Sequence, residues 1–397
     1  MRTINVGLIG AGFMGKAHSL AYATMPMFFW PAPAMPARKI IADAGAELAA
    51  DGAARYGYED STADWRRVVE HPDVDLVDIA TPNNMHAEIA EAAFAAGKHV
   101  ITEKPLARTL EESRRMYEAA VAAGVVNMVA FNYRRTPAVA LAKRYIDEGA
   151  IGRVLNFRGT YLQDWSADPD SPLSWRFQHD VAGSGAIGDI GTHVMDIARY
   201  LVGEVSSVNS MLATWIPDRP KDSGVLDTLG TGGKDRTAPR DAVDVDDEMV
   251  TMLRFSSGAI GSLEATRNAW GHHNFLTFEV HGTEGSIQFN YERRDELQVC
   301  FASDGDDRRG FRTVYTGAPH PYGEALWPIP GLGIGYGDTK IVECHDLMEA
   351  IATDGKVHPN FGDGYQVAKI SDAVQRSAAT DSWVSVSTLD GSETGGA

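Results

Sequence analysis

The first apolar run of the chain leads directly into three closely spaced glycines. Residues 4–9 are mainly apolar, Gly10, Gly12 and Gly15 follow in the spacing G-x-G-x-x-G, and helix-forming residues come next. In a strand–turn–helix, such glycines allow a tight turn, a close approach to a pyrophosphate and close helix–strand packing. The first N–H groups of the helix then attract phosphate. The context favours a dinucleotide-binding turn, with Phe13 and Met14 as further cofactor contacts, over a plain glycine-rich turn.

The composition excludes several classes of function. With 397 residues, of which 44% are hydrophobic, the chain is long enough for two domains with separate cores. A net charge of −18 argues against nucleic-acid binding and against anionic membranes, because both need basic patches. We see neither an apolar run of the roughly 20 residues that span a membrane nor a signal peptide. The two cysteines are too few for a disulfide framework and lack the spacing of a metal site. We therefore expect a cytoplasmic protein.

Strands and helices alternate through the first third of the chain. The apolar runs that we interpret as strands after the first one lie at residues 39–42, 74–80, 99–102 and 126–131. Alternation at this spacing predicts an α/β, doubly wound parallel sheet covered on both faces. We therefore assign residues 1–131 to a Rossmann dinucleotide-binding domain. Four prolines between residues 22 and 38 are expected to end the first helix and to form an aromatic loop.

The acidic residue at the end of the second strand indicates which cofactor is bound. Asp43 stands where dinucleotide folds place the carboxylate that binds the adenosine ribose. Ala44 and Gly45 follow, so no cation is at hand for a 2′-phosphate, and we expect NAD rather than NADP. The alternative is that Asp43 merely caps the helix expected at residues 47–56.

Two further strands end in polar residues at the edge where ligands bind to such sheets. Ligands of open α/β sheets lie outside the carboxyl ends of the strands. The candidate cofactor contacts at these strand ends are Thr81, Pro82, Asn83 and His86 after one strand, and Glu103 and Lys104 after the next.

The pattern changes after residue 131. Longer alternating strands follow with few helical crossovers, which predicts an α+β domain with a large, mostly antiparallel open sheet and helices on one face. We assign residues 132–397 to this substrate-binding and oligomerisation domain. Two long segments, at residues 218–246 and 304–338, are expected to be irregular, and the aromatic residues of the second suggest an ordered cover over a site.

A glycine-rich run in the second half leads to Asp189 and His193. The two residues are four positions apart, so on a helix they share one face. This spacing could suggest a metal pair, but no third ligand is obvious. From spacing alone, a capped or hydrogen-bonded structural pair remains the stronger interpretation, with catalysis as the alternative.

The glycine turn, Thr81-Pro82-Asn83, Glu103-Lys104-Pro105 and Asp189-Ile-Gly-Thr-His193 occur in this order and together resemble the Gfo/Idh/MocA family of nicotinamide-dependent oxidoreductases. The resemblance covers nearly the whole chain. It implies a Rossmann domain, an open-sheet substrate domain, dimers or tetramers built sheet to sheet, and a cis peptide before Pro105. The loop at residues 27–33 and residues 161–165 resemble the branch of the family that acts on levoglucosan.

The resemblance also implies an activity and the residues that carry it. We expect NAD-dependent oxidation of a secondary hydroxyl of a pyranose sugar or levoglucosan-like anhydrosugar, to the 3-keto product, without a metal. A base must reach the hydroxyl proton: Lys104 is assigned to the reacting oxygen, His193 to proton relay, and Asp189 to orientation. The expected sugar contacts are these three residues together with Tyr133, Arg134, Gln163, Trp165 and Tyr336. Further cofactor contacts are expected from Asn132, Trp175 and Arg176.

Three alternatives remain open at this stage. The first is an inositol dehydrogenase of the same family. The second is a lyase or glycosidase that oxidises and re-reduces a sugar with tightly held NAD and no net cofactor turnover. The third is a non-catalytic NAD-binding regulator, which the presence of Lys104, Asp189 and His193 disfavours.

Overall fold

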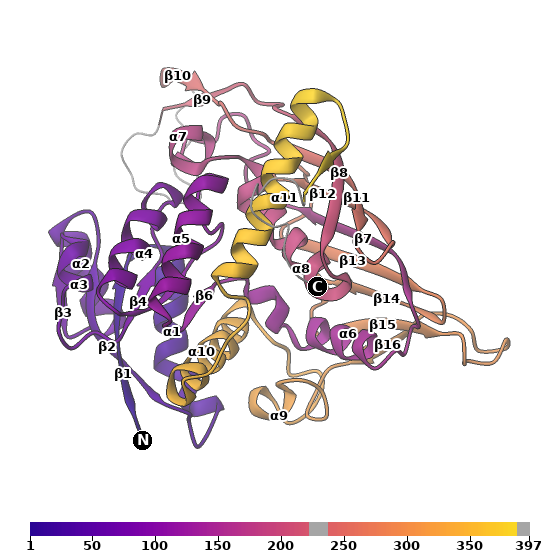
Figure 1. The fold of residues 1–397 in the computed structure, drawn as a ribbon, viewed down its shortest axis with the longest axis horizontal. Coiled ribbons are helices and arrows are strands. Elements are labelled where there is room, and N and C mark those ends of the chain that lie inside the picture. The colour runs from indigo at the N-terminus through magenta and orange to yellow at the C-terminus, as the bar shows by residue number, and fades with distance from the viewer. Residues whose placement is uncertain (222–236, 387–397) are drawn as a thin grey trace. The chain divides into compact units, whose positions relative to one another are not determined.

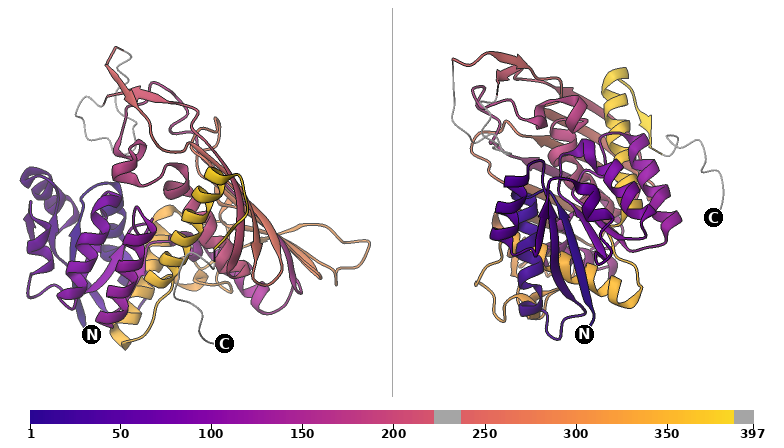
Figure 2. Two further views of the ribbon diagram at one scale, coloured as in Figure 1. Left: turned by 45° about the horizontal axis from the view of Figure 1, so that its top comes forward. Right: turned by 90° about the vertical axis from the view of Figure 1, so that its left-hand side faces the viewer.

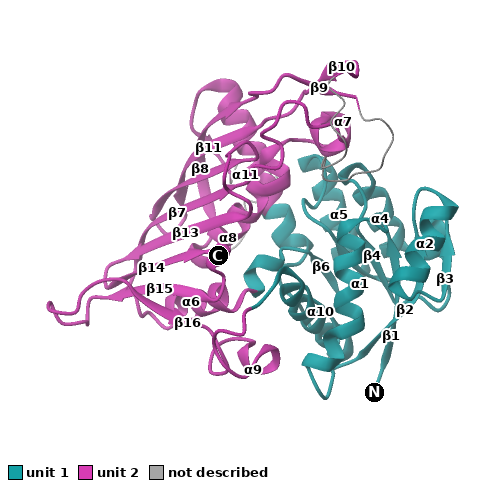
Figure 3. Cartoon of the chain, turned by 180° about the vertical axis from the view of Figure 1, so that it is seen from behind, with its two compact units in different colours: residues 1–135, 334–366 teal, residues 136–333, 367–397 magenta. Residues whose placement is uncertain are grey.

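A computed structural model describes residues 1–221 and 237–386. The chain divides into two compact units (Figure 3). Unit 1 comprises Met1–Arg135 and Ile334–Gln366, and unit 2 comprises Thr136–Gly333 and Val367–Ala397. Residues 334–366, which the sequence assignment places in the second domain, therefore belong to the compact unit that holds the glycine turn.

Unit 1 is built on a six-stranded sheet in the order β3-β2-β1-β4-β5-β6 (Figure 1). The strands are β1 (Thr3–Ile9), β2 (Met35–Ala42), β3 (Asp60–Thr62), β4 (Leu76–Ile79), β5 (His99–Thr102) and β6 (Asn127–Val129). Every neighbouring pair is parallel. This order is that of the dinucleotide-binding Rossmann fold, so the predicted fold class of the first domain is confirmed.

Six helices accompany the sheet of unit 1. They are α1 (Phe13–Phe28), α2 (Ala46–Tyr56), α3 (Trp65–Val69), α4 (His86–Ala95), α5 (Leu110–Ala123) and α10 (Tyr336–Thr353). Helix α10 packs against α1, and its Ile341, Leu347 and Ile351 join one buried cluster with Ile4 and Val6 of β1. Hydrophobic burial therefore incorporates a segment from far along the chain into the Rossmann unit.

The expected early end of the first helix is wrong. Helix α1 continues through Pro26 to Phe28, and β2 begins at Met35, so the loop is much shorter than residues 22–38. Tyr22 and Met25 are buried in the core cluster that α10 shares. Packing of this last turn outweighs the hydrogen bond that Pro26 cannot donate.

Unit 2 is organised around a nine-stranded sheet in the order β16-β15-β14-β13-β7-β12-β11-β8-β17. All neighbouring pairs are antiparallel except β7 and β12. The strands are β7 (Val154–Leu162), β8 (Val205–Ala213), β11 (Glu248–Phe255), β12 (Ile260–Thr266), β13 (Phe275–Gly282), β14 (Gly285–Asn290), β15 (Glu296–Phe301), β16 (Arg312–Tyr315) and β17 (Val384–Ser385). The predicted large, mostly antiparallel open sheet is confirmed.

Helices cover one face of this sheet. They include α6 (Pro137–Asp147), α8 (Thr192–Val202) and α11 (Phe361–Thr380), and Figure 2 shows α11, in yellow, lying along the sheet. Ser371 of α11 contacts Met195 of α8, and Ser377 accepts a hydrogen bond from the N–H of Ser210 in β8. Along β11, residues on the covered side alternate with exposed ones, as expected for a sheet with one packed face.

The two segments expected to be irregular contain short elements. Residues 218–246 include β9 (Asp218–Pro220) and β10 (Arg240–Ala242), which pair with each other, while residues 222–236 lie outside the described part. Residues 304–338 include β16, α9 (Gly323–Leu326) and the start of α10. Of the helices in residues 1–221 and 237–386, none is long and apolar enough to cross a membrane.

Candidate active site

The glycine turn has the geometry that a dinucleotide needs. Gly10 has φ of +109°, a left-handed conformation that favours glycine. A Cβ on Gly15 would lie 2.0 Å from the carbonyl oxygen of Gly10, so helix α1 meets the turn too closely for any side chain. Gly12 precedes α1 without a capping side chain, which leaves its first N–H groups directed outward for phosphate oxygens. These features fit an NAD pyrophosphate.

Asp43 is held beside this turn at the end of β2. One carboxylate oxygen accepts a hydrogen bond from the N–H of Ala11 at 2.7 Å, and the other accepts from Ala44 at 2.7 Å. Helix α2 begins after Gly45 and has no side-chain cap, so the alternative role of Asp43 as its cap is wrong. The carboxylate therefore links the end of the second strand to the glycine turn, and its contact with the adenosine ribose stays a prediction.

Aromatic side chains from both segments of unit 1 gather at the start of α1. The rings of Phe13 and Tyr336 stack with centroids 6.0 Å apart, and Tyr133 meets Tyr336 edge-on at 6.4 Å. The Tyr336 hydroxyl lies 3.5 Å from Sδ of Met14. Tyr336, which is predicted to bind the sugar, therefore lies beside Phe13 and Met14, which are predicted to bind the cofactor.

The segment η2 (Asn132–Arg135) is also anchored within unit 1. Asn132 is buried and donates its side-chain N–H to the Thr339 hydroxyl of α10 at 2.7 Å. The Arg134 guanidinium lies 3.8 Å from the carboxylate of Asp363. The proposed ligand contacts of Asn132 and Arg134 stay predictions.

His86 links the ends of β4 and β5. It is fully buried, and its ring nitrogens lie 3.1 Å from the carbonyl oxygen of Thr81 and 3.0 Å from that of Pro105. Burial lowers the pKa of His86, although the carbonyl oxygens of Thr81, Pro105 and Leu106 favour its protonated form. The neutral ring donates one hydrogen bond, so it can bind only one of these carbonyl oxygens while it packs between the segments that follow β4 and β5. Its predicted contact with the cofactor stays a prediction.

The turn that carries Lys104 follows β5. The peptide between Lys104 and Pro105 is cis, as the family resemblance implied. Glu103 is buried, and its carboxylate accepts a hydrogen bond from the N–H of Lys104 at 3.1 Å and faces His18 of α1 at 3.0 Å. The Glu103 carboxylate thus binds other residues of unit 1, and its predicted contact with the cofactor stays a prediction.

The charged state of His18 makes stability depend on pH. Burial opposes the imidazolium, but Asp78, 2.9 Å away, and the hydrogen bond to Glu103 outweigh burial and Lys340 and raise the pKa of His18 from 6.5 to about 9. Tyr22 also donates to Asp78. A group whose pKa is raised by folding contributes stability that is present below pH 6.5 and lost as the pH passes 9.

We therefore expect the unfolding temperature to fall between pH 6.5 and pH 9 more steeply in the natural protein than in His18→Gln. The difference in free energy of unfolding across this interval is expected to be at most about 3 kcal/mol. Thermal unfolding followed by circular dichroism at a series of pH values measures it. Parallel pH dependences of the two proteins would show that His18 does not carry the extra proton.

In unit 2, Asp189 and His193 lie at a distorted helix start. Asp189 is in a π-helical turn, η4 (Ile187–Gly191), which continues into α8, where His193 is buried. The two residues therefore lie on one continuous helical segment whose first turn is wider than that of an α-helix. The His193 ring lies 5.9 Å from the ring of Tyr161 on β7. Such π turns are frequent at functional sites.

Two arginines face the Asp189 carboxylate. The fully buried guanidinium of Arg267 is 3.4 Å from one oxygen, and Arg176 of η3 (Trp175–Phe177) is 3.9 Å from the other. Arg176 also covers the Trp175 ring at 4.4 Å, so the predicted Trp175–Arg176 pair is assembled beside Asp189. Arg267 was missed in the sequence, because it follows an ordinary strand and no motif marks it.

Of the further side chains predicted to bind the sugar, Gln163 and Trp165 lie in the same unit as Asp189 and His193, whereas Tyr133, Arg134 and Tyr336 belong to unit 1. The Trp165 indole donates to Gln163 at 3.0 Å, and Gln163 donates to the hydroxyl of Tyr161 and to Asn274 at 3.3 and 3.2 Å. Asn274 accepts from the Tyr161 hydroxyl. Because Tyr161 neighbours His193, the structure brings Gln163, Trp165 and His193 into one connected group, to which Asn274 is added.

Replacing Arg267 with methionine is expected to lower kcat/KM for the sugar roughly 10- to 100-fold and to raise its KM, because Asp189 loses a buried cation 3.4 Å from its carboxylate. Steady-state kinetics with the unfolding temperature as a folding check measure this. The matched control is Arg312→Met, which removes an exposed guanidinium paired with Asp304. Unchanged kinetics together with a lowered unfolding temperature would limit Arg267 to stability.

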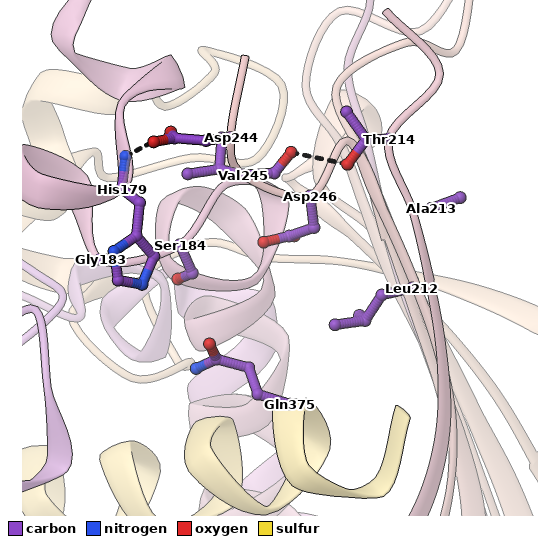
Figure 4. Close-up of a pocket in the computed structure, with 10 residues that line it drawn as sticks. All are labelled: His179, Gly183, Ser184, Leu212, Ala213, Thr214, Asp244, Val245, Asp246 and Gln375. Carbon is purple, nitrogen blue, oxygen red and sulfur yellow. Dashed lines mark hydrogen bonds between the residues drawn. The ribbon is translucent and has the colours of Figure 1, made fainter. Parts of the chain in front are cut away.

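The start of the glycine-rich run that leads to Asp189 lines a pocket (Figure 4). Its wall includes Gly183, Ser184, His179 and Gln375, and none of the predicted site residues. Asp246 lines the pocket, and its carboxylate accepts hydrogen bonds from the N–H groups of Gly185 and Ile187 at the start of η4, at 2.7 and 2.8 Å. Within the described ranges, no cluster of His, Cys, Asp or Glu is arranged to hold a metal ion.

Comparison with known proteins identifies the family. Residues 4–131 match the model of an oxidoreductase family with an NAD-binding Rossmann fold, and residues 139–288 match the GFO/IDH/MocA C-terminal domain. The chain is 70% identical to levoglucosan dehydrogenase from Pseudarthrobacter phenanthrenivorans over 97% of its own length and 99% of that protein. The chain belongs to the Gfo/Idh/MocA family. It is an NAD-dependent oxidoreductase, so the predicted enzyme class and cofactor are confirmed.

Two further comparisons mark how far the similarity extends. A solved structure of levoglucosan dehydrogenase in complex with NADH and levoglucosan matches with a TM-score of 0.92 and 68% identity, covering 97% of this chain and 99% of that one. A scyllo-inositol 2-dehydrogenase (NAD(+)) from Bacillus subtilis is 31% identical, covering 75% of this chain and 77% of that protein. The similarity is therefore far stronger to an enzyme of anhydrosugars than to one of inositols.

Proposed function

We propose that the protein oxidises levoglucosan, or a closely similar anhydrosugar, at a secondary hydroxyl with NAD, and that the product is the 3-keto sugar. The observation that carries this proposal is the 70% identity to levoglucosan dehydrogenase over 97% of the chain. The connected group of Gln163, Trp165 and His193 supports it, because sugars are bound by planar polar groups and aromatic faces.

The proposed chemistry divides among a few side chains. Bound NAD supplies the hydride acceptor. Lys104 accepts the hydroxyl proton and stabilises the developing alkoxide, which general base catalysis requires within hydrogen-bond reach. His193 hydrogen-bonds the same or the neighbouring hydroxyl and relays the proton. Asp189, held by Arg267 and Arg176, orients the sugar or His193.

The test is a panel of levoglucosan, pyranose sugars and inositols, assayed with NAD and then with NADP. We expect NADH to accumulate fastest with levoglucosan and little NADPH to form. A clear preference for an inositol would favour the first alternative, which the B. subtilis relative supports. Conversion of a glycoside without NADH accumulation would favour the lyase, and binding of NAD without turnover of any compound would favour the regulator.

We also propose that the protein is a cytoplasmic homodimer or homotetramer assembled through the sheet of unit 2. On the side of this sheet where β11 residues are exposed, large apolar side chains remain accessible: Met211, Val250, Met252 and Ile260. Contiguous exposed apolar side chains of this kind mark interfaces. A monomeric mass in light scattering at micromolar concentration would contradict the proposal.

A further inference from the structure

Seven side chains, alternately negative and positive, form one connected series of ion pairs in unit 1, in which the cations His18 and Lys340 also lie 3.1 Å apart. Each neighbouring pair lies within 2.9 to 3.8 Å, and all members except the last are nearly inaccessible to solvent. In order, they are Asp78, His18, Glu103, Lys340, Glu343, Arg135 and Asp346. Lys340 and Glu343 both come from α10, so the segment at residues 334–366 supplies the centre of this series.

The members around Glu103 are kept ionised by each other. Burial alone would raise the pKa of Glu103, but Lys340 and His18, with a smaller effect from Lys104, hold it well below its ordinary range. Burial would lower the pKa of Lys340, and Glu103 and Glu343 raise it instead. Desolvating this many charges is costly, and apolar residues of similar size often stabilise a core equally well. Stability alone is therefore a weak reason for such a series.

Through Glu103, this series of ion pairs also contacts the backbone of Lys104. One oxygen of Glu103 faces Nζ of Lys340 at 2.9 Å and Nε2 of His18 at 3.0 Å, and the other accepts the N–H of Lys104 at 3.1 Å. On the far side of Lys104, His86 contacts the carbonyl oxygen of Pro105. The backbone that carries Lys104 is thus fixed on both sides by buried side chains.

We propose that Glu103 and Lys340 form a positioning pair for Lys104: Lys340 of α10 holds the Glu103 carboxylate, and this carboxylate sets the position and the charge environment of the Lys104 amine during sugar oxidation. The inference rests on the proposed function of Lys104 as the base. It assigns the segment at residues 334–366 of unit 1 a role in the reaction that acts through Lys104.

If the charges of Glu103 and Lys340 act on Lys104, replacing each one should shift the pH profile of the reaction, whereas a loss of packing alone should not. In Lys340→Met, the Glu103 carboxylate loses its cation, so the ammonium form of Lys104 is favoured and the rising limb of the kcat/KM pH profile moves to higher pH. In Glu103→Gln, the negative charge beside Lys104 is lost, and the same limb moves to lower pH. Both variants are expected to lose roughly 100-fold in kcat, the effect of a displaced reacting group, while the affinity for NADH is nearly unchanged.

The experiment measures pH profiles of kcat/KM, NADH binding by fluorescence and unfolding temperature in both variants. Lys340→Arg is expected to restore most of kcat, because it returns the cation. The matched control is Asp346→Asn, which removes the partly buried carboxylate at the far end of the same series of ion pairs, separated from Glu103 by three members. It is expected to lower the unfolding temperature and to leave the pH profile unchanged.

The positioning role would be overturned if the rising limb of the kcat/KM profile moved in the same direction in Lys340→Met and in Glu103→Gln. Full kcat in Lys340→Met would overturn it as well. If Lys340→Met does not fold, Glu103→Gln decides alone: it keeps an acceptor for the N–H of Lys104, and an unmoved limb would contradict the proposal. Failure of the proposed function is recognised separately, because it would appear as normal turnover in a protein that lacks the Lys104 amine.

Discussion

Lys104→Ala is expected to lower kcat for sugar oxidation by roughly 100- to 10,000-fold, the range that one general base contributes. The reason is chemical: hydride leaves a carbinol carbon readily only when the hydroxyl proton is removed as well. Lys104 follows β5, on the turn that Glu103 and His86 contact, and alanine at this position leaves no titratable group to accept the proton. Stopped-flow and steady-state measurements of NADH formation with saturating sugar test this expectation.

The cofactor affinity separates this effect from a folding defect. Because the turn geometry is set by Glu103, His86 and the Gly10 region, NADH binding by Lys104→Ala is expected to remain within a few fold of the natural protein. The matched control is Lys39→Met, which removes an ammonium of the same unit that pairs with Glu59 on the surface. Normal turnover in Lys104→Ala would remove Lys104 from the mechanism and leave His193 as the base.

The elements that could be predicted from the sequence are those with local causes. The strand, glycines and helix at the N-terminus are contiguous, and each glycine has a steric reason that acts over a few residues, as the 2.0 Å contact of a Gly15 Cβ with Gly10 shows. The strands of unit 2, such as β7, β11 and β13, alternate buried and more exposed residues along their length, so the presence of alternating strands after residue 131 could be predicted. Periodicity and turn chemistry carry such information.

The rest depends on contacts between distant segments, which a single sequence does not reveal. Helix α10 joins unit 1 because its apolar face meets α1, and its Lys340 meets Glu103 from 237 positions away. Arg267 meets Asp189 from 78 positions away. The resemblance to a family supplied Lys104, Asp189 and His193, but it gave no reason to select the partners that hold them. The low helix propensity of proline also gave a wrong expectation at Pro26, where the packing of Tyr22 and Met25 stabilises a longer helix.

Gly15→Ala is expected to weaken NADH binding roughly 10- to 100-fold, because a Cβ at this position forces the turn and α1 apart. The obstacles are backbone atoms: the added carbon would lie 2.0 Å from the oxygen and 3.1 Å from the carbon of the Gly10 carbonyl, and neither can rotate away as a flexible side chain would. The displacement moves the first N–H groups of α1 away from the phosphates they bind. Fluorescence titration with NADH measures the loss of affinity.

The kinetic pattern should differ from that of Lys104→Ala. Because Gly15 acts on binding, saturating NAD is expected to restore much of kcat, whereas no concentration of NAD compensates for a missing base. Gly310→Ala serves as the control, since a Cβ there meets no atom within 4 Å and leaves the glycine turn untouched. If Gly15→Ala bound NADH as tightly as this control, α1 would have to tolerate the displacement, and close packing would no longer explain the third glycine of the motif.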